Sequence, residues 1–131
     1  MERSIRIATA VFVLAGGFVH LQLWDSGYRG ISYIGPLFVV NGVVSAILAI
    51  AVLVRRSRPV VVGGIAFSFA TLAALVMSRT VGLLGFTERE WTDQAVRATA
   101  AEVGAIVAFF ALLVAFNRQG VVVAARARRS R

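Results

Sequence analysis

The stretch "PLFVVNGVVSAILAIAVLV", residues 36–54, decides the fold of this chain. It contains no charged residue, and its polar side chains are limited to Asn41 and Ser45. A helix needs about 20 consecutive apolar residues to cross the hydrocarbon layer of a bilayer. Pro36 favours a helix start, because a first-turn residue needs no amide donor. The stretch therefore predicts a transmembrane helix.

Three further segments have the same character: residues 5–24, 59–78 and 98–116, with Pro59 at the start of the second. The 131-residue chain is 59% hydrophobic and only 15% charged. Soluble domains are typically about half apolar and about a quarter charged. The excess of apolar residues indicates that lipid is the solvent. We therefore predict a single all-α domain, an antiparallel four-helix transmembrane bundle.

The fourth helix is predicted to begin before its apolar part. In "FTEREW", residues 86–91, Thr87 and Glu90 have the spacing of a capping box, flanked by aromatic residues at staple positions. The helix should start near residue 88 and end at Gly120, because glycine favours the left-handed C-cap conformation. Residues 117–131 are predicted to be a basic cytoplasmic tail.

The positive charge predicts the orientation. All fourteen basic residues are arginine; ten lie near the termini or in the 55–58 loop, and four lie on the opposite side: Arg29, Arg79, Arg89 and Arg97. By the positive-inside rule, both termini are cytoplasmic. The arginines flank apolar segments instead of covering a polar face, which argues against nucleic-acid binding despite the net charge of +8. The predicted partner is the lipid bilayer.

Two groups of residues are expected to position the helices, one relative to the membrane surface and one relative to each other. Aromatic side chains at the outer boundary are predicted to be interface anchors: Trp24, Tyr28, Tyr33 and Trp91. Glycines within the apolar segments are predicted to allow close helix packing: Gly16, Gly17, Gly63, Gly64 and Gly104. Such faces also allow a homo-oligomer or a larger membrane complex.

Polar side chains inside apolar segments are the candidate functional residues, because they are costly in lipid. Four segments or their ends place such groups at a similar depth: His20, Asn41, Arg79, Arg97 and Glu102. One interpretation is structural, with Arg79 or Arg97 paired to Glu102 and His20 bonded to Asn41 or a backbone carbonyl. The other is a small polar pocket open to the outside.

The sequence predicts no catalytic residue, metal or cofactor. It has no cysteine and a single histidine, whereas a metal site needs several ligands in a fixed geometry. A haem held by His20 and Met77 has no further support, since a methionine in a helix more often packs. The protein is therefore expected not to be an enzyme.

Two stretches carry a family resemblance. "GGFVHLQLWDSGYRGISYIGPLFVVNGVVSAILA" (16–49) and "SRTVGLLGF" (78–86) resemble small uncharacterised four-span integral membrane proteins of actinobacteria. More distantly, the Gly-x-x-His of the first segment is similar to that of DoxX-like membrane proteins. The resemblance implies a location in the bacterial cytoplasmic (inner) membrane and no particular activity.

Three functions remain open at this stage. The first expectation is a structural or accessory membrane component that associates through helix faces. The alternative is a small transporter or ligand-binding membrane protein whose outward-facing pocket uses the polar residues above. The third is a redox or quinone-handling protein.

Overall fold

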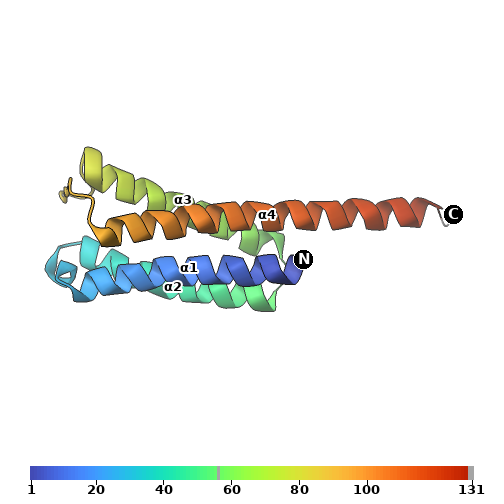
Figure 1. The fold of residues 1–131 in the computed structure, drawn as a ribbon, viewed down its shortest axis with the longest axis horizontal. Helices are drawn as coiled ribbons and strands as arrows, with labels where there is room; N and C mark the ends of the chain where they lie inside the picture. The colour runs from blue at the N-terminus through green and yellow to red at the C-terminus, as the bar shows by residue number, and fades with distance from the viewer. Residues whose placement is uncertain (56, 130–131) are drawn as a thin grey trace.

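The computed structural model describes residues 1–55 and 57–129, with side chains through residue 118. Within this part the chain forms four long helices, α1 (Glu2–Asp25), α2 (Ile34–Val54), α3 (Arg58–Thr80) and α4 (Asp93–Arg129), and a short 3-10 helix η1 (Tyr28–Gly30) (Figure 1). All four long helices are long and apolar enough to cross a membrane. The all-α prediction and the four apolar helices are confirmed.

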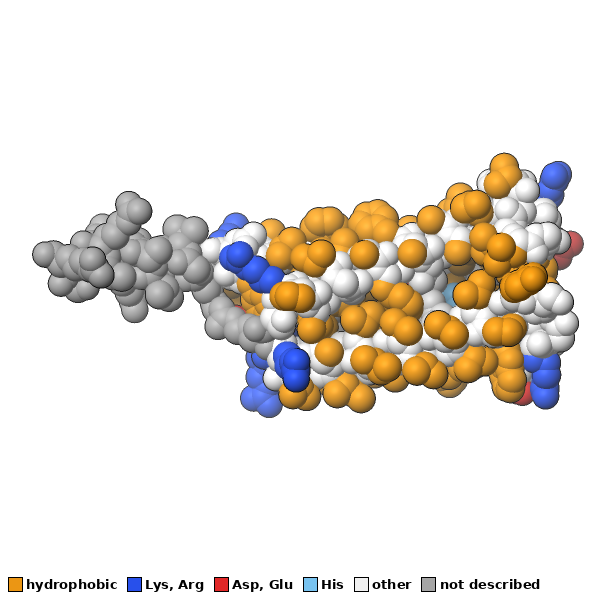
Figure 2. All heavy atoms as spheres, turned by 180° about the vertical axis from the view of Figure 1, so that it is seen from behind, with side chains coloured by type: hydrophobic (Ala, Val, Ile, Leu, Met, Phe, Trp, Pro, Cys, Tyr) orange, Lys and Arg blue, Asp and Glu red, His pale blue; other side chains and the backbone are white. Residues whose placement is uncertain are grey.

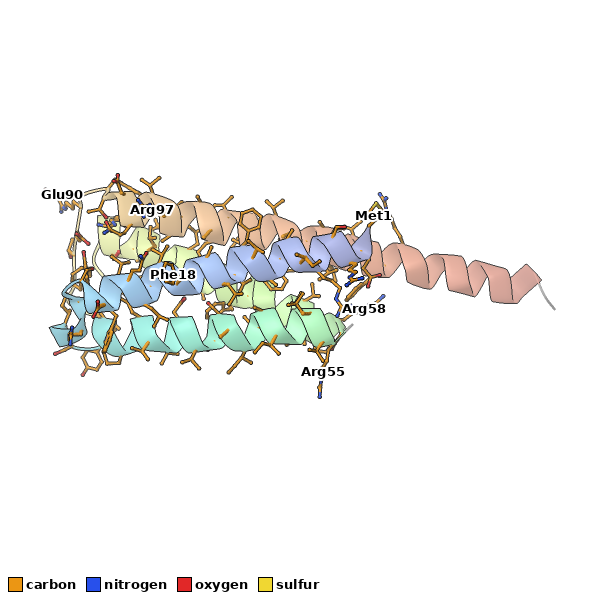
Figure 3. The ribbon with its side chains drawn as sticks, turned by 60° about the horizontal axis from the view of Figure 1, so that its bottom comes forward. Met1, Phe18, Arg55, Arg58, Glu90 and Arg97 are labelled. Atoms are coloured by element: carbon orange, nitrogen blue, oxygen red, sulfur yellow. The ribbon has the colours of Figure 1, made fainter. Side chains whose placement is uncertain are left out.

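The helices lie side by side along one axis, and the chain turns back at each connection (Figure 1). α1 packs against α2 and α4, and α4 packs against α3, whereas α2 and α3 touch far less. We call the end with the α1–α2 and α3–α4 connections the loop end. In Figure 3, Glu90 and Arg97 lie at the loop end, and Met1, Arg55 and Arg58 lie at the other. The bundle is thus a ring of helices that is weakly closed between α2 and α3.

The bundle has an apolar interior and an apolar exterior. Its main core, away from the loop end, contains Val13, Val52, Val61, Ala105, Phe109, Leu112 and Phe116. Hydrophobic side chains also cover the outside between the charged ends (Figure 2). Soluble monomers rarely expose apolar surface on this scale, so the exterior matches a hydrocarbon environment.

Helix α4 begins at Asp93, and the prediction of a start near residue 88 is wrong. The N-cap is Thr92, whose hydroxyl accepts a hydrogen bond from the Ala95 amide at 3.2 Å. The earlier residues are held in a non-helical path, because Arg79 donates to the backbone carbonyls of Glu88 and Glu90. Contacts from the end of α3 thus displace the predicted capping box at Thr87.

The other helix ends differ by smaller amounts. α2 begins at Ile34, two residues before Pro36, so the proline still lies in the first turn. α4 continues through Gly120 to Arg129, so the predicted C-cap is wrong; an internal glycine costs a helix only about 1 kcal/mol. Most of the predicted tail, residues 117–131, therefore has a helical backbone, and its side chains from residue 119 onward lie outside the described residues.

An arginine joins α1 to the end of α2. The Arg6 side chain donates from Nε to the Val52 carbonyl and from Nη2 to the Leu53 carbonyl, both at 2.7 Å. The last carbonyls of a helix have no partner within it. Arg6 therefore satisfies backbone groups of α2 and fixes the first turns of α1 beside them.

Candidate functional site

A cavity of about 260 Å³ lies between α2 and α3 near the loop end. It exists because these two helices make few contacts with each other while each packs well on its other neighbour. Small side chains on α3, Ala70 and Ala74, leave room opposite Phe38 and Asn41 of α2. Seen from the α2–α3 side, the pale blue of the chain's single histidine is visible in a hollow between apolar side chains (Figure 2).

The cavity wall is mainly apolar, with polar groups from three helices and both loops. The polar part consists of His20, Tyr28, Asn41, Thr71, Ser78, Arg79 and Glu88. An apolar hollow with a few placed polar groups is typical of small-molecule sites. Its volume is near the lower limit of about 300 Å³ for such sites, which limits the ligand to a small molecule or one segment of a larger one.

His20 is buried and contributes its ring to the cavity. Its Nδ1 lies 2.8 Å from the carbonyl oxygen of Gly16. A carbonyl oxygen only accepts, so Nδ1 carries the hydrogen and the ring is oriented by its own helix. The ring also meets Phe38 edge-on, with centroids 5.3 Å apart.

Asn41 connects α2 to α3 beside the cavity. Its Nδ2 donates to the Thr71 hydroxyl at 3.0 Å, and its Oδ1 accepts from the Ser45 hydroxyl at 3.4 Å. This is one of the few links across the weak side of the ring. Asn41 and Thr71 both line the cavity, so this link places polar groups in its wall.

Arg79 holds the loop that covers the cavity at the loop end. Its Nη1 lies 3.1 Å from Glu88 Oε2, and the Tyr28 hydroxyl donates to the same oxygen at 2.7 Å. Only 8% of the Arg79 side chain and 24% of the Glu88 side chain are exposed. The guanidinium also lies 5.9 Å from the centre of the Trp91 ring. We call Tyr28, Arg79 and Glu88 the roof triad.

A tight turn places two apolar side chains under this roof. Leu83 and Phe86 exchange both backbone hydrogen bonds, at 2.7 and 2.8 Å. Leu84 and Gly85 between them have φ of 50° and 80°, as a type I′ turn requires. The turn directs Leu83 and Phe86 to the cavity wall.

The structure brings three of the five predicted polar residues to one cavity: His20, Asn41 and Arg79. Arg97 is exposed and is not part of the wall. Glu102 is buried but is not part of the wall; it hydrogen-bonds to Ser68, and a Cβ added at Gly16 would lie 3.0 Å from its Oε1.

Sequence reasoning missed the partner of Arg79. The arginine pairs with Glu88 of the following loop, and not with Glu102. Tyr28, predicted to be an interface anchor, turns inward to the roof triad, whereas Tyr33 and Trp91 are exposed and Trp24 lies 5.2 Å from the Arg29 guanidinium. The nine-residue spacing of Arg79 and Glu88 matches no helix or strand period, so the sequence did not predict this ion pair. Only the path of the loop brings the two side chains together.

Four of the five predicted packing glycines lie at contacts inside the chain. A Cβ at Gly17 would lie 2.6 Å from Ser45 Cβ, and one at Gly64 or Gly104 would overlap the ring of Phe109 or Phe12. Gly16 faces Glu102, as described above. Gly63 is the exception, with nothing within 4 Å of its added Cβ. These small residues therefore serve mainly the internal packing of the bundle.

The roof triad predicts an unusual tyrosine titration. Burial first, and then the hydrogen bond and the negative charge of Glu88, raise the pKa of Tyr28 from 10.0 to about 12. The stability that this contributes is complete below pH 10 and is lost as pH rises through about 12. The phenolate absorbance of the wild type minus that of Tyr28→Phe should therefore titrate near pH 12.

Replacing the carboxylate supplies the control for this titration. In Glu88→Gln the midpoint should move down toward 10.0, because both contributions of the carboxylate are removed. A wild-type difference curve centred near pH 10 would show that Tyr28 is not held by the roof triad.

No known protein family, curated protein sequence or solved structure matches this chain. Among the described residues, no three His, Asp or Glu side chains gather where they could hold a metal ion. The function is therefore inferred from the cavity and its polar groups.

Proposed function

We propose that this small multi-pass membrane protein binds a small, mainly apolar molecule in the cavity between α2 and α3. The observation that carries the proposal is the cavity itself, an apolar hollow of about 260 Å³ with His20, Asn41 and Arg79 in its wall. An apolar hollow with a few placed polar groups is typical of small-molecule sites. Of the functions open from the sequence, the geometry favours the ligand-binding alternative.

The ligand reaches the site from the membrane. Leu37 and Val40 belong to the cavity wall and are also exposed on the outer face of α2. The cavity therefore continues to the lipid-facing surface between α2 and α3. The roof triad covers it at the loop end, which favours sideways entry by a molecule dissolved in the bilayer.

We place the protein in a bacterial cytoplasmic membrane as an antiparallel bundle with both termini in the cytoplasm. The ten arginines near the termini and the 55–58 loop support this orientation, and so does the separation of Arg55 and Arg58 from Glu90 in Figure 3. An impermeant thiol reagent on intact cells should label a cysteine introduced at Ser26, but not one at Ser57. The opposite pattern would invert the bundle and open the cavity toward the cytoplasmic leaflet.

The accessory function stays a prediction, as do a homo-oligomer and the actinobacterial resemblance. The accessory function would need small-residue helix faces that are free to contact a partner. Most of these glycines are instead packed against other residues of this chain: Gly16, Gly17, Gly64 and Gly104. Gly63 alone of this set offers an open small-residue position.

Filling the cavity tests the proposal. Ala74 is in the cavity wall, whereas the adjacent Ala73 is exposed and outside it. Native mass spectrometry from mild detergent should show a bound small molecule on the wild type and Ala73→Leu. Ala74→Leu should lose this mass, because its larger side chain occupies the site. A wild type without any bound mass, or equal retention by both variants, would contradict ligand binding in this cavity.

A further inference from the structure

We infer that the cavity selects an uncharged ligand with a hydroxyl group next to its apolar part, and that His20 and Thr71 recognise this hydroxyl. The inference rests on the proposed function and names the chemistry of the ligand. It starts from hydrogen-bonding groups in the cavity wall whose partners are incomplete in the described structure.

His20 supplies an acceptor. Its Nδ1–H is used by the Gly16 carbonyl at 2.8 Å, which leaves Nε2 with a lone pair in the uncharged ring. Among residues 1–55 and 57–118 no hydrogen bond to Nε2 is formed, and the ring's other contact is the edge of Phe38. Nε2 is not one of the fully enclosed unpaired atoms of the described residues, and His20 lines the cavity, so a ligand in the cavity that donates a hydrogen bond suits this position.

Thr71 supplies a donor on the facing helix. Its oxygen accepts the hydrogen bond of Asn41 Nδ2 at 3.0 Å. Other threonines of the bundle, such as Thr9 and Thr99, donate their hydroxyl hydrogen to the carbonyl four residues earlier. Within the described residues Thr71 makes no such bond, so its hydrogen is available to an acceptor in the cavity.

The combination matches a hydroxyl group. A hydroxyl donates one hydrogen bond and accepts two, so a single ligand oxygen has what both His20 and Thr71 require. An ether or a quinone carbonyl accepts but does not donate, and leaves Nε2 unpaired. The apolar remainder of the ligand then lies along Phe38, Phe67 and Ala74.

The charges around the cavity favour an uncharged ligand. The guanidinium of Arg79 is neutralised by the Glu88 carboxylate 3.1 Å away, so the roof contributes no net charge. Nε of Arg79 is buried without a hydrogen-bond partner among the described residues, which adds an unmet donor at the loop end, but no unpaired positive charge. A carboxylate or an ammonium group would enter an apolar site without a counter-ion, which is costly.

The test uses the single histidine as a reporter. Protein labelled with ¹⁵N-histidine and ¹⁵N-asparagine in micelles is titrated with four probes of one chain length: 1-decanol, decyl methyl ether, decane and decanoate. The Asn41 side-chain amide reports occupation of the cavity, and Asn117, exposed and remote on α4, is the internal control. The His20 Nε2 resonance reports a hydrogen bond from the ligand.

The expected result is a saturable shift of Asn41, but not Asn117, with a shift of Nε2 for 1-decanol alone. 1-Decanol should bind about tenfold more tightly than decyl methyl ether, the effect of one hydrogen bond. In His20→Phe this preference should disappear while both probes still shift Asn41. Because the wild-type spectra decide the question first, the test survives a variant that does not fold.

The opposing outcomes separate this inference from the proposed function. If all probes shift Asn41 equally and Nε2 stays unchanged, the hydroxyl selectivity is wrong and the cavity still binds ligands. A doubly protonated ring in the unliganded protein, or tightest binding of decanoate, would also overturn it. If no probe shifts Asn41, ligand binding in the cavity itself fails.

Discussion

Arg79→Gln should lower the free energy of unfolding by roughly 3 kcal/mol. The Arg79 side chain is 8% exposed, pairs with Glu88 at 3.1 Å and donates to two loop carbonyls. Its removal leaves a half-buried carboxylate and those carbonyls with fewer partners, and such groups are costly when unpaired. Unfolding by SDS in mixed micelles measures the change.

Arg29→Gln is the matched control, because it removes the same charge at the same end of the bundle. Arg29 pairs with Asp25 at 3.3 Å, but these side chains are 60% and 78% exposed. An exposed ion pair contributes less than about 1 kcal/mol, so this variant should unfold like the wild type. Equal losses in both variants would show that Arg79 acts through charge alone and not through the roof contacts.

Gly64→Ala should destabilise the bundle by roughly 1–3 kcal/mol, the usual cost of overpacking a core. The added methyl group would overlap the ring of Phe109, which is completely buried in the main core. The ring packs in one core cluster with Val13, Val61 and Leu112. Either the ring or helices α3 and α4 must therefore move to admit the methyl group.

Gly63→Ala adds the same methyl group one residue earlier, where nothing lies within 4 Å. Alanine is the better helix former by about 1 kcal/mol, so this variant should be as stable as the wild type or slightly more stable. The same SDS titration compares the two. If Gly64→Ala proved as stable as Gly63→Ala, the close α3–α4 contact through Phe109 would be wrong.

The main core and the cavity differ in packing. The core around Phe109 is filled by large side chains, whereas on α3 the wall of the space between α2 and α3 includes the small side chains of Ala70 and Ala74. The roof triad spans the loop end of this gap, as the proposed ligand site requires.

The sequence by itself determined the four helices. A hydrocarbon layer requires about 20 apolar residues whose backbone groups bond within the segment, so segments such as 36–54 have few alternatives to a spanning helix. Burial of His20, Asn41 and Glu102 also followed from the sequence, since polar groups in apolar helices turn away from lipid.

Only the tertiary structure decided which polar groups meet. Local signals favoured a helix with its N-cap at Thr87. Arg79 instead donates hydrogen bonds to the carbonyls of Glu88 and Glu90, which lie outside the helix, and α4 begins at Asp93. The path of this loop also makes Glu88, and not Glu102, the ion-pair partner of Arg79. The cavity arises because α1 and α4 hold α2 and α3 apart. Helix formation depends on neighbouring residues, whereas pairings and voids depend on the packing of distant segments, which no local pattern encodes.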